Sequence, residues 1–300
     1  MTTLNSELLP PNPQNNKSDG FIVLDKPSGM TSRQAGGAVA RMFNQKTCGH
    51  IGTLDPMASG TLIIALGQAT KMIPYMESDN IKEYLFQIKW GIRTDTDDIT
   101  GTVAEQNDRI PTNEEIAAVL SQLVGTYDQM PPDFSAKKIN GVPAYKLARQ
   151  GRAPTLTPKK IMIYTLTMDE ETYCMTCSAG TYVRAVVRDL AHILAAIATT
   201  SMIRRTRTNG VGIKDAVTLD ILENNRYNGN ELAKYLLAPD FGLDDIPVAK
   251  IGKNEAALFE NGGFVSCDLP GGLCRVYAGN RFVGMGIIDG GVLKPKRILN

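Results

Sequence analysis

Residues 49–60 form the stretch of the chain whose composition and spacing are best suited to chemistry. They read Gly-His-Ile-Gly-Thr-Leu-Asp-Pro-Met-Ala-Ser-Gly, which places Asp55 directly before Pro56. The three glycines allow backbone shapes that other residues avoid, and the proline stiffens the chain after the carboxylate. An aspartate side chain is ionised at neutral pH, so Asp55 can attack as a nucleophile or accept a proton without further activation. The alternative is that Asp55 only shapes a turn, as aspartate commonly does.

Three other patterns are weak signals for a metal ion. Cys174 and Cys177 have the spacing of a metal-binding pair, but residues three apart on a predicted strand point to opposite faces. The acidic residues between positions 95 and 98 lack the ligand spacing of a calcium loop and favour a turn between strands. Two histidines, His50 and His192, are too few for a histidine cluster. The sequence also has no Walker loop and no full dinucleotide fingerprint, so we expect neither a metal nor a cofactor.

Composition is that of an ordinary globular protein. The 300 residues are 43% apolar and 21% charged, and the net charge of +1 neither requires nor excludes a nucleic-acid partner. No stretch approaches the roughly 20 apolar residues that cross a bilayer. Residues 1–20 lack the apolar centre of a secretory signal, and five cysteines are an odd number. We therefore expect a cytoplasmic protein with reduced thiols, no membrane contact and a disordered tail at 1–20.

Strand and helix patterns alternate irregularly along the chain. Apolar runs at 21–24 and 61–66 predict buried strands, and Thr31 can cap a helix between them. Residues 83–90 alternate in the way of a half-buried strand, with Tyr84 on the face of Phe86, Ile88 and Trp90. Two further strands, at 161–168 and 172–179, precede a helix that starts near Thr181. The pattern predicts an α+β fold with a mixed, largely antiparallel sheet.

Composition also divides the chain into parts. Residues 127–158 are rich in Pro, Gly, Lys and Arg and predict an extended surface insertion within a domain at 21–247. Residues 248–300 are rich in glycine and short strand-like runs, which predicts a small, separate β-rich domain.

The motif around Asp55 resembles the catalytic loop of the pseudouridine synthases, in particular of the TruB type. The resemblance continues in three further segments, which are Lys82-Glu83-Tyr84-Leu85-Phe86, Gly180-Thr181-Tyr182-Val183-Arg184 and Arg204-Arg205-Thr206. It implies that 21–247 is a catalytic pseudouridine synthase domain and that 127–158 clasps RNA. The terminal Lys294-Pro295-Lys296-Arg297 resembles part of a PUA-like RNA-binding domain, which would occupy 248–300.

The resemblance implies an activity: the isomerisation of uridine 55 in the tRNA T loop to pseudouridine, with the target base flipped out of its stack. Asp55 would be the nucleophile, and Arg184 would pair with it and keep it ionised and oriented. The reaction breaks the N-glycosidic bond and rejoins the base through its carbon 5, which needs no redox chemistry. Whether Asp55 attacks the base or the sugar, or opens a glycal path, stays open at this point.

Three further residues gain roles from the same resemblance. Tyr84 would stack on the flipped base and move a proton, Tyr182 would line the base pocket, and His50 would fill the space that the nucleotide leaves. Each has a simpler alternative in ordinary packing, as Arg184 has in being a surface charge of a helix.

RNA binding is expected from basic residues that contact phosphates, which are Lys137, Lys138, Arg149, Arg152, Lys159, Lys160, Arg204, Arg205 and Arg207. The alternative for each cluster is a solvated face. The partner would be the tRNA T stem-loop, bound by a monomer without guide RNA. Two rival functions remain at this stage: an RNA-binding scaffold or tRNA-folding factor, and a guide-RNA-dependent member of the same superfamily.

Overall fold

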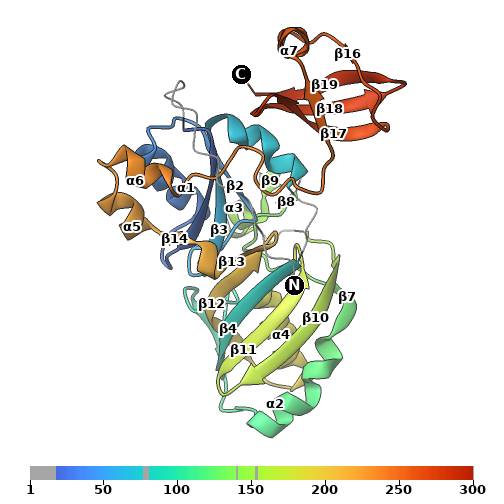
Figure 1. Ribbon diagram of the computed structural model, residues 1–300. Coiled ribbons are helices and arrows are strands. Elements are labelled where there is room, and N and C mark those ends of the chain that lie inside the picture. Colours follow the sequence, from blue (N-terminus) through green and yellow to red (C-terminus); the bar gives the residue numbers. More distant parts are fainter. Residues whose placement is uncertain (1–17, 77–80, 140, 153–154, 300) are drawn as a thin grey trace.

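The computed structural model describes residues 18–76, 81–139, 141–152 and 155–299. In this part of the chain, a large domain is built on a ten-stranded sheet, and a small β-rich domain follows at the carboxyl end (Figure 1). The tail expected at 1–20 falls almost entirely on residues 1–17, which lie outside the described residues. The first strand, β1, starts at Gly20 and ends at Lys26.

The large sheet is mixed and largely antiparallel, as predicted. Its central order is β14-β1-β3-β12-β4-β11-β10-β7, with β2 beside β3 and β13 beside β12. Within the large sheet, the described strands form only two parallel pairings, β1 with β14 and β3 with β12. The strands after β1 are β2 (Cys48–Ile51), β3 (Ser59–Leu66), β4 (Ile81–Trp90), β7 (Gly125–Gln129), β10 (Lys159–Asp169), β11 (Thr172–Ser178), β12 (Ala198–Thr208), β13 (Val211–Gly212) and β14 (Val217–Thr218).

A glycine permits the parallel contact at the centre of the sheet. Gly60 pairs with Arg205 where β3 meets β12, and its φ is 107°. A Cβ atom there would lie 2.2 Å from the Arg205 carbonyl oxygen. Any larger residue would push β3, which follows the Asp55 loop, away from β12, which carries Arg205.

Two helices cover one face of the large sheet with apolar side chains. Helix α1 (Ser32–Met42) begins at a Thr31–Gln34 capping box, which satisfies backbone donors that the helix leaves unpaired. Its Val39 and Val187 of α4 (Val183–Ile193) belong to the same buried cluster as Leu62 of β3. The other helices of the large domain are α2 (Asn113–Val119), α3 (Ala144–Ala148), α5 (Leu219–Asn224) and α6 (Gly229–Ala233), with 3₁₀ turns η1 (Gly67–Tyr75), η2 (Leu120–Leu123) and η3 (Ile213–Asp215).

The segment expected as an insertion at 127–158 begins later in the structure. Residues 127–129 belong to β7, which pairs with the start of β10, so the segment leaves the sheet only after Gln129. It then contains a hairpin of β8 (Lys138–Ile139) and β9 (Val142–Pro143), followed by α3. A second hairpin, of β5 (Ile92–Thr94) and β6 (Val103–Gln106), follows β4.

The small domain has its own sheet and its own core. Its strands are β15 (Val248–Ile251), β16 (Val265–Ser266), β17 (Gly272–Ala278), β18 (Arg281–Asp289) and β19 (Val292–Ile298), and its helix is α7 (Lys253–Glu260). Phe259 of α7 is fully buried in that core, while Met285 of β18 belongs to the same buried apolar cluster as Phe21 and Ile63 of the large domain. Arg275 also pairs with Asp240 at 3.2 Å across the junction. The predicted small β-rich domain is therefore present, and it is docked on the large one.

None of the helices within the described ranges is both long and apolar enough to cross a membrane.

Candidate active site

The loop that carries Asp55 joins β2 to β3 and is held by the first residue of α1 and by the turn that precedes this helix. The Ser32 hydroxyl donates to the Leu54 carbonyl at 2.9 Å and accepts from the Leu54 N–H at 2.8 Å. Gly29 N–H donates to the Pro56 carbonyl at 2.8 Å. These bonds fix the backbone on both sides of Asp55, so its carboxylate is presented from a rigid support.

Asp55 is paired with Arg184, as the resemblance implied. The Arg184 Nε donates to Asp55 Oδ2 at 2.8 Å, although 129 positions separate the two residues. The Arg184 side chain is only 3% exposed, whereas that of Asp55 is 35% exposed. Arg184 is therefore no surface charge of a helix, and the carboxylate that it holds still reaches solvent.

Three further groups hold the other side of the Arg184 guanidinium. Its Nη1 donates to the Thr96 carbonyl at 2.6 Å and lies 3.6 Å from Asp98 Oδ2, and its Nη2 donates to the Phe134 carbonyl at 3.0 Å. The acidic residues near 95 do form the turn between β5 and β6 that the sequence predicted. Sequence reasoning missed that this turn packs against α4 and supplies two of the contacts, because contacts between such distant segments leave no local signal.

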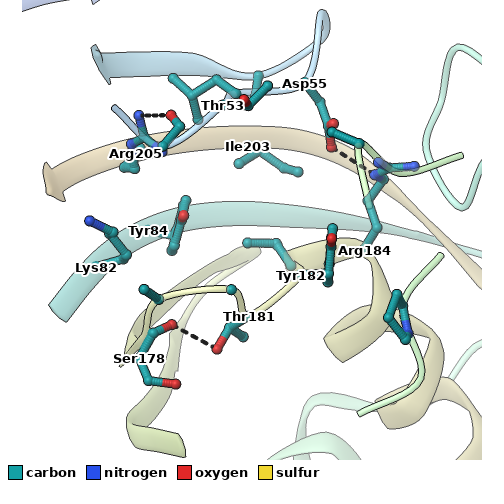
Figure 2. A pocket seen from close by; sticks show the side chains of 18 of the residues that line it. Thr53, Asp55, Lys82, Tyr84, Ser178, Thr181, Tyr182, Arg184, Ile203 and Arg205 are labelled. Carbon is teal, nitrogen blue, oxygen red and sulfur yellow. Dashed lines mark hydrogen bonds and ion pairs between the residues drawn. The ribbon is translucent and has the colours of Figure 1, made fainter. Parts of the chain in front are cut away.

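A cavity of about 860 Å³ opens beside the Asp55–Arg184 pair. Figure 2 shows the pair at one end, Tyr84 and Tyr182 in the middle, and Lys82 and Arg205 at the other end. Asp55 is the one carboxylate among the charged residues that line it within the described chain; the cations are Lys82, Lys137, Lys159, Lys160, Arg184 and Arg205. The cavity thus combines aromatic walls with a strong excess of positive charge, which favours an anionic ligand that carries a planar ring.

Tyr84 and Tyr182 are positioned by different elements. Tyr84 stands on β4 on the same face as Lys82, half-buried, and burial raises the pKa of its phenol, so the hydroxyl is protonated at neutral pH. Tyr182 precedes α4, where its N–H donates to Gln129 Oε1 at 2.9 Å and its carbonyl accepts from Gln129 Nε2 at 3.3 Å. Gln129 is 1% exposed and acts as a clamp on the backbone of Tyr182.

His50 lies on β2 and is not among the residues that line the cavity. Its Nε2 lies 3.1 Å from the Thr53 hydroxyl, two residues before Asp55. Burial, together with the positive charge of Arg205, lowers the pKa of His50, so its imidazole is neutral at pH 7. A neutral ring beside the catalytic loop is compatible with stacking on RNA, and that role remains a prediction.

The basic residues expected to grip phosphate lie in different environments. Lys137 lines the cavity and donates to the Thr157 carbonyl at 2.7 Å, and Lys138 is exposed on the β8–β9 hairpin. The Arg149 guanidinium lies 5.7 Å from the centre of the Tyr145 ring. These three side chains belong to the segment that follows β7.

Arg204 and Arg205 differ from the expectation of two exposed phosphate contacts. Ile203 and Arg205 both line the cavity, so Arg204 between them points to the opposite face of the sheet, where it pairs with Asp25 at 2.7 Å. Arg205 is only 1% exposed and donates to backbone carbonyls. Adjacent residues of a strand cannot serve one surface, because their side chains alternate.

Sequence reasoning assigned no role to Lys82 and Ser178, which also line the cavity. Lys82 is 7% exposed and donates to Asn209 Oδ1, while Lys159, which was expected to contact phosphate, lines the cavity with them. The available signal was the alternation of Lys82 with Tyr84 on one strand, which places both on the same face.

Comparison with known proteins places this geometry in a family. Residues 40–183 match the TruB family pseudouridylate synthase (N terminal domain), and residues 247–299 match the pseudouridine synthase II TruB, C-terminal, domain. The chain is 40% identical over 296 residues to tRNA pseudouridine synthase B of Bradyrhizobium diazoefficiens, which covers 94% of this chain and 86% of the relative. It is 39% identical to the protein of that name from Caulobacter vibrioides, over 93% and 95% of the two chains.

The fold also resembles that of a solved structure, the crystal structure of a Cbf5-Nop10-Gar1 complex. The TM-score is 0.67 at 20% identity, and the likeness covers 98% of this chain and 90% of the other. The two family models and the relatives at about 40% identity show that the chain is a pseudouridine synthase. Within that class of enzymes, the chain belongs to the TruB family.

Proposed function

We propose that this chain converts uridine 55 in the T loop of tRNA to pseudouridine. The observation that carries the proposal is the pairing of Asp55 with a buried Arg184 at the end of a cationic, aromatic cavity. The name tRNA pseudouridine synthase B, borne by relatives at about 40% identity, supports tRNA as the substrate. The likeness of the Asp55 loop to enzymes that modify the T loop supports the position.

The target uridine has to leave its stack to reach Asp55. The carboxylate lies within a cavity of about 860 Å³ rather than on a protruding edge, so a base held inside a helix cannot approach it. Flipping a base out costs a few kcal/mol and costs least where the base is already unpaired, as in a loop. Tyr84 and Tyr182 offer aromatic surfaces that replace part of the lost stacking.

Asp55 acts as the nucleophile on the flipped nucleotide. The bond between N1 of the base and C1′ of the sugar breaks, and a bond between C5 and C1′ forms after the base turns. The C5 proton leaves and N1 gains a proton, so the product is an isomer of the substrate and no oxidant, reductant or energy source is consumed. Arg184 holds the carboxylate aimed at the nucleotide.

Lysines at the cavity, Lys137 and Lys159 among them, hold the sugar-phosphate backbone beside the target. Lys137 lines the cavity from the segment after β7, and Lys159 lines it from the first residue of β10. Such contacts add affinity and salt dependence without reading sequence. We expect a single chain to suffice, without guide RNA, metal ion or cofactor.

A T stem-loop transcript that carries tritium at C5 of its uridines tests the proposal. The purified protein is incubated with it in EDTA and without guide RNA, and release of tritium to water is followed. We expect about one equivalent to be released, and none from a control stem-loop with cytidine at position 55. Tight binding without release would instead support an RNA-binding scaffold. Release that requires a guide RNA would support the guide-dependent class.

A further inference from the structure

Arg205 is a buried cation in the cavity whose surroundings do not suit a phosphate contact. Its side chain is 1% exposed, and it is the largest of the fully buried side chains among the described residues. Burying a guanidinium is costly unless its donors are satisfied. The groups that accept hydrogen bonds from the Arg205 guanidinium therefore indicate the role of this side chain.

Two of its partners are backbone carbonyls on different segments. The Nε donates to Thr61 O at 2.8 Å, and an Nη2 proton goes to Gly52 O at 2.8 Å. Thr61 belongs to β3, and Gly52 opens the loop that ends in Asp55 three residues later. Gly52 has a φ of 65°, and a Cβ there would lie 3.2 Å from Arg205 Nη1. The guanidinium is thus packed directly against the start of the catalytic loop.

The third group that faces Arg205 is Tyr84. The two residues are opposite each other in the register of β12 and β4, and Figure 2 shows their side chains next to each other on these neighbouring strands. Arginine has donors but no acceptor, so in a hydrogen bond between the two side chains the Tyr84 oxygen accepts. The one hydroxyl proton of Tyr84 is then free to be donated elsewhere, and the cavity with Asp55 lies on its open side.

The charge of Arg205 acts on the same phenol. Burial raises the pKa of Tyr84, and the nearby guanidinium opposes that rise by stabilising a phenolate oxygen. A phenol that gives up and regains a proton during the reaction works best when its pKa is not far above neutral pH. Burial alone would raise the pKa of Tyr84, and a nearby cation limits that rise.

We propose that Arg205 is a positioning residue that ties the Asp55 loop to Tyr84 and keeps the Tyr84 hydroxyl aimed as a donor into the cavity. This inference rests on the proposed function, because the acceptor of that proton is the flipped uridine. Arg205 acts through Tyr84 and the loop, and it does not hold the RNA backbone.

A double-mutant cycle on rate and affinity separates this role from a phosphate contact. The four proteins are the wild type, Arg205→Lys, Tyr84→Phe and the double variant. Each is assayed with the tritiated T stem-loop for single-turnover release and for the RNA Kd at several salt concentrations. Arg109→Lys is the matched control, because Arg109 pairs with Glu115 at 2.7 Å at the surface and lies outside the cavity.

We expect Arg205→Lys to slow release on the order of 100-fold, since a lysine keeps the charge but cannot bind both carbonyls with a planar fork that also faces Tyr84. The Kd and its salt dependence should stay within about twofold. In the Tyr84→Phe background, Arg205→Lys should change the rate by less than about threefold, because the Tyr84 hydroxyl through which Arg205 acts is absent. Arg109→Lys should leave both quantities unchanged.

Two results would overturn the inference. Independent, multiplicative effects of the two substitutions would show that Arg205 does not act through Tyr84. A raised Kd with a salt slope lower by about one would show that Arg205 holds a phosphate. If circular dichroism shows that Arg205→Lys is unfolded, Arg205→Gln enters the same cycle with the same expected pattern. Release by the wild type, measured in parallel, tests the proposed function separately.

Discussion

Arg184 holds Asp55 at 2.8 Å from a position that is almost fully buried, while the carboxylate remains about one-third open to the cavity. Arg184 is buried far more deeply than Asp55, so one residue of the pair is fixed and the other stays accessible. The arginine is fixed by Asp55, Thr96, Asp98 and Phe134 from three different segments, and the aspartate can still meet a substrate. Such an arrangement orients a nucleophile without covering it.

The first prediction concerns this pair. Arg184→Met should lower the single-turnover rate on the order of 10²- to 10³-fold, because the carboxylate loses the charge that orients it. The Kd for the T stem-loop should change little, since Arg184 is buried beneath Asp55. Filter binding and tritium release measure the two quantities. Arg188→Met, one turn further along α4, is the control and should retain the rate. If Arg184→Met instead weakens RNA binding as much as it slows release, Arg184 contacts the RNA.

The second prediction concerns Gln129, which clamps Tyr182. Gln129→Leu leaves the Tyr182 N–H without its acceptor, which should lower the free energy of unfolding by about 1–3 kcal/mol. The rate of label release should fall as well, because Tyr182 lines the cavity. Urea unfolding and the release assay check both. Gln106→Leu, at an exposed position of β6, should change neither, and an unaltered stability of Gln129→Leu would contradict the clamp.

The third prediction concerns the pH dependence of stability through Lys26. Its side chain is fully buried and donates to the carbonyls of Pro27 at 2.8 Å and Met30 at 2.5 Å. Burial lowers the pKa of Lys26 from 10.5 to about 8. Between these values the unfolded chain binds more protons than the folded one, so the free energy of unfolding rises with pH. Below pH 8 both states are protonated, and the cost of burying the charge is fully present.

Urea unfolding of the wild type and Lys26→Met at several pH values checks this prediction. Between pH 7 and 9.5 the wild type should gain about 2 kcal/mol relative to the variant. The exposed Lys250→Met serves as the control and should show a constant difference from the wild type. A pH-independent difference for Lys26→Met would show that burial does not lower the pKa of Lys26 in the folded protein.

Much of the fold could be predicted from local patterns. Thr31 and Gln34 form the expected start of α1, and Cys174 is exposed while Cys177 is buried, as alternation on a strand requires. Local patterns did not predict the structure of segments that pair with strands far away in the sequence. Tyr127 looked like part of a surface segment by composition, yet it pairs with Ile161 of β10 inside the sheet.

The site was predictable to a different extent. Resemblance, not periodicity, pointed to Asp55 with Arg184, because 129 positions separate them and no local pattern joins them. The contact of Asp98 with Arg184 depends on how the β5–β6 turn packs on α4, which the sequence does not encode in any short window. The opposite faces of Arg204 and Arg205 follow from strand alternation alone, and treating them as one basic cluster overlooked that rule.

Asp55→Asn tests the central claim most directly, because it removes the charge of the carboxylate and keeps its shape. Tritium release from the T stem-loop and the RNA Kd are measured for the variant and the wild type side by side. We predict that release falls by about 10⁴-fold or more, to background, while the Kd stays within a few-fold. Release by Asp55→Asn at a rate close to that of the wild type would contradict the claim that the reaction turns on this carboxylate.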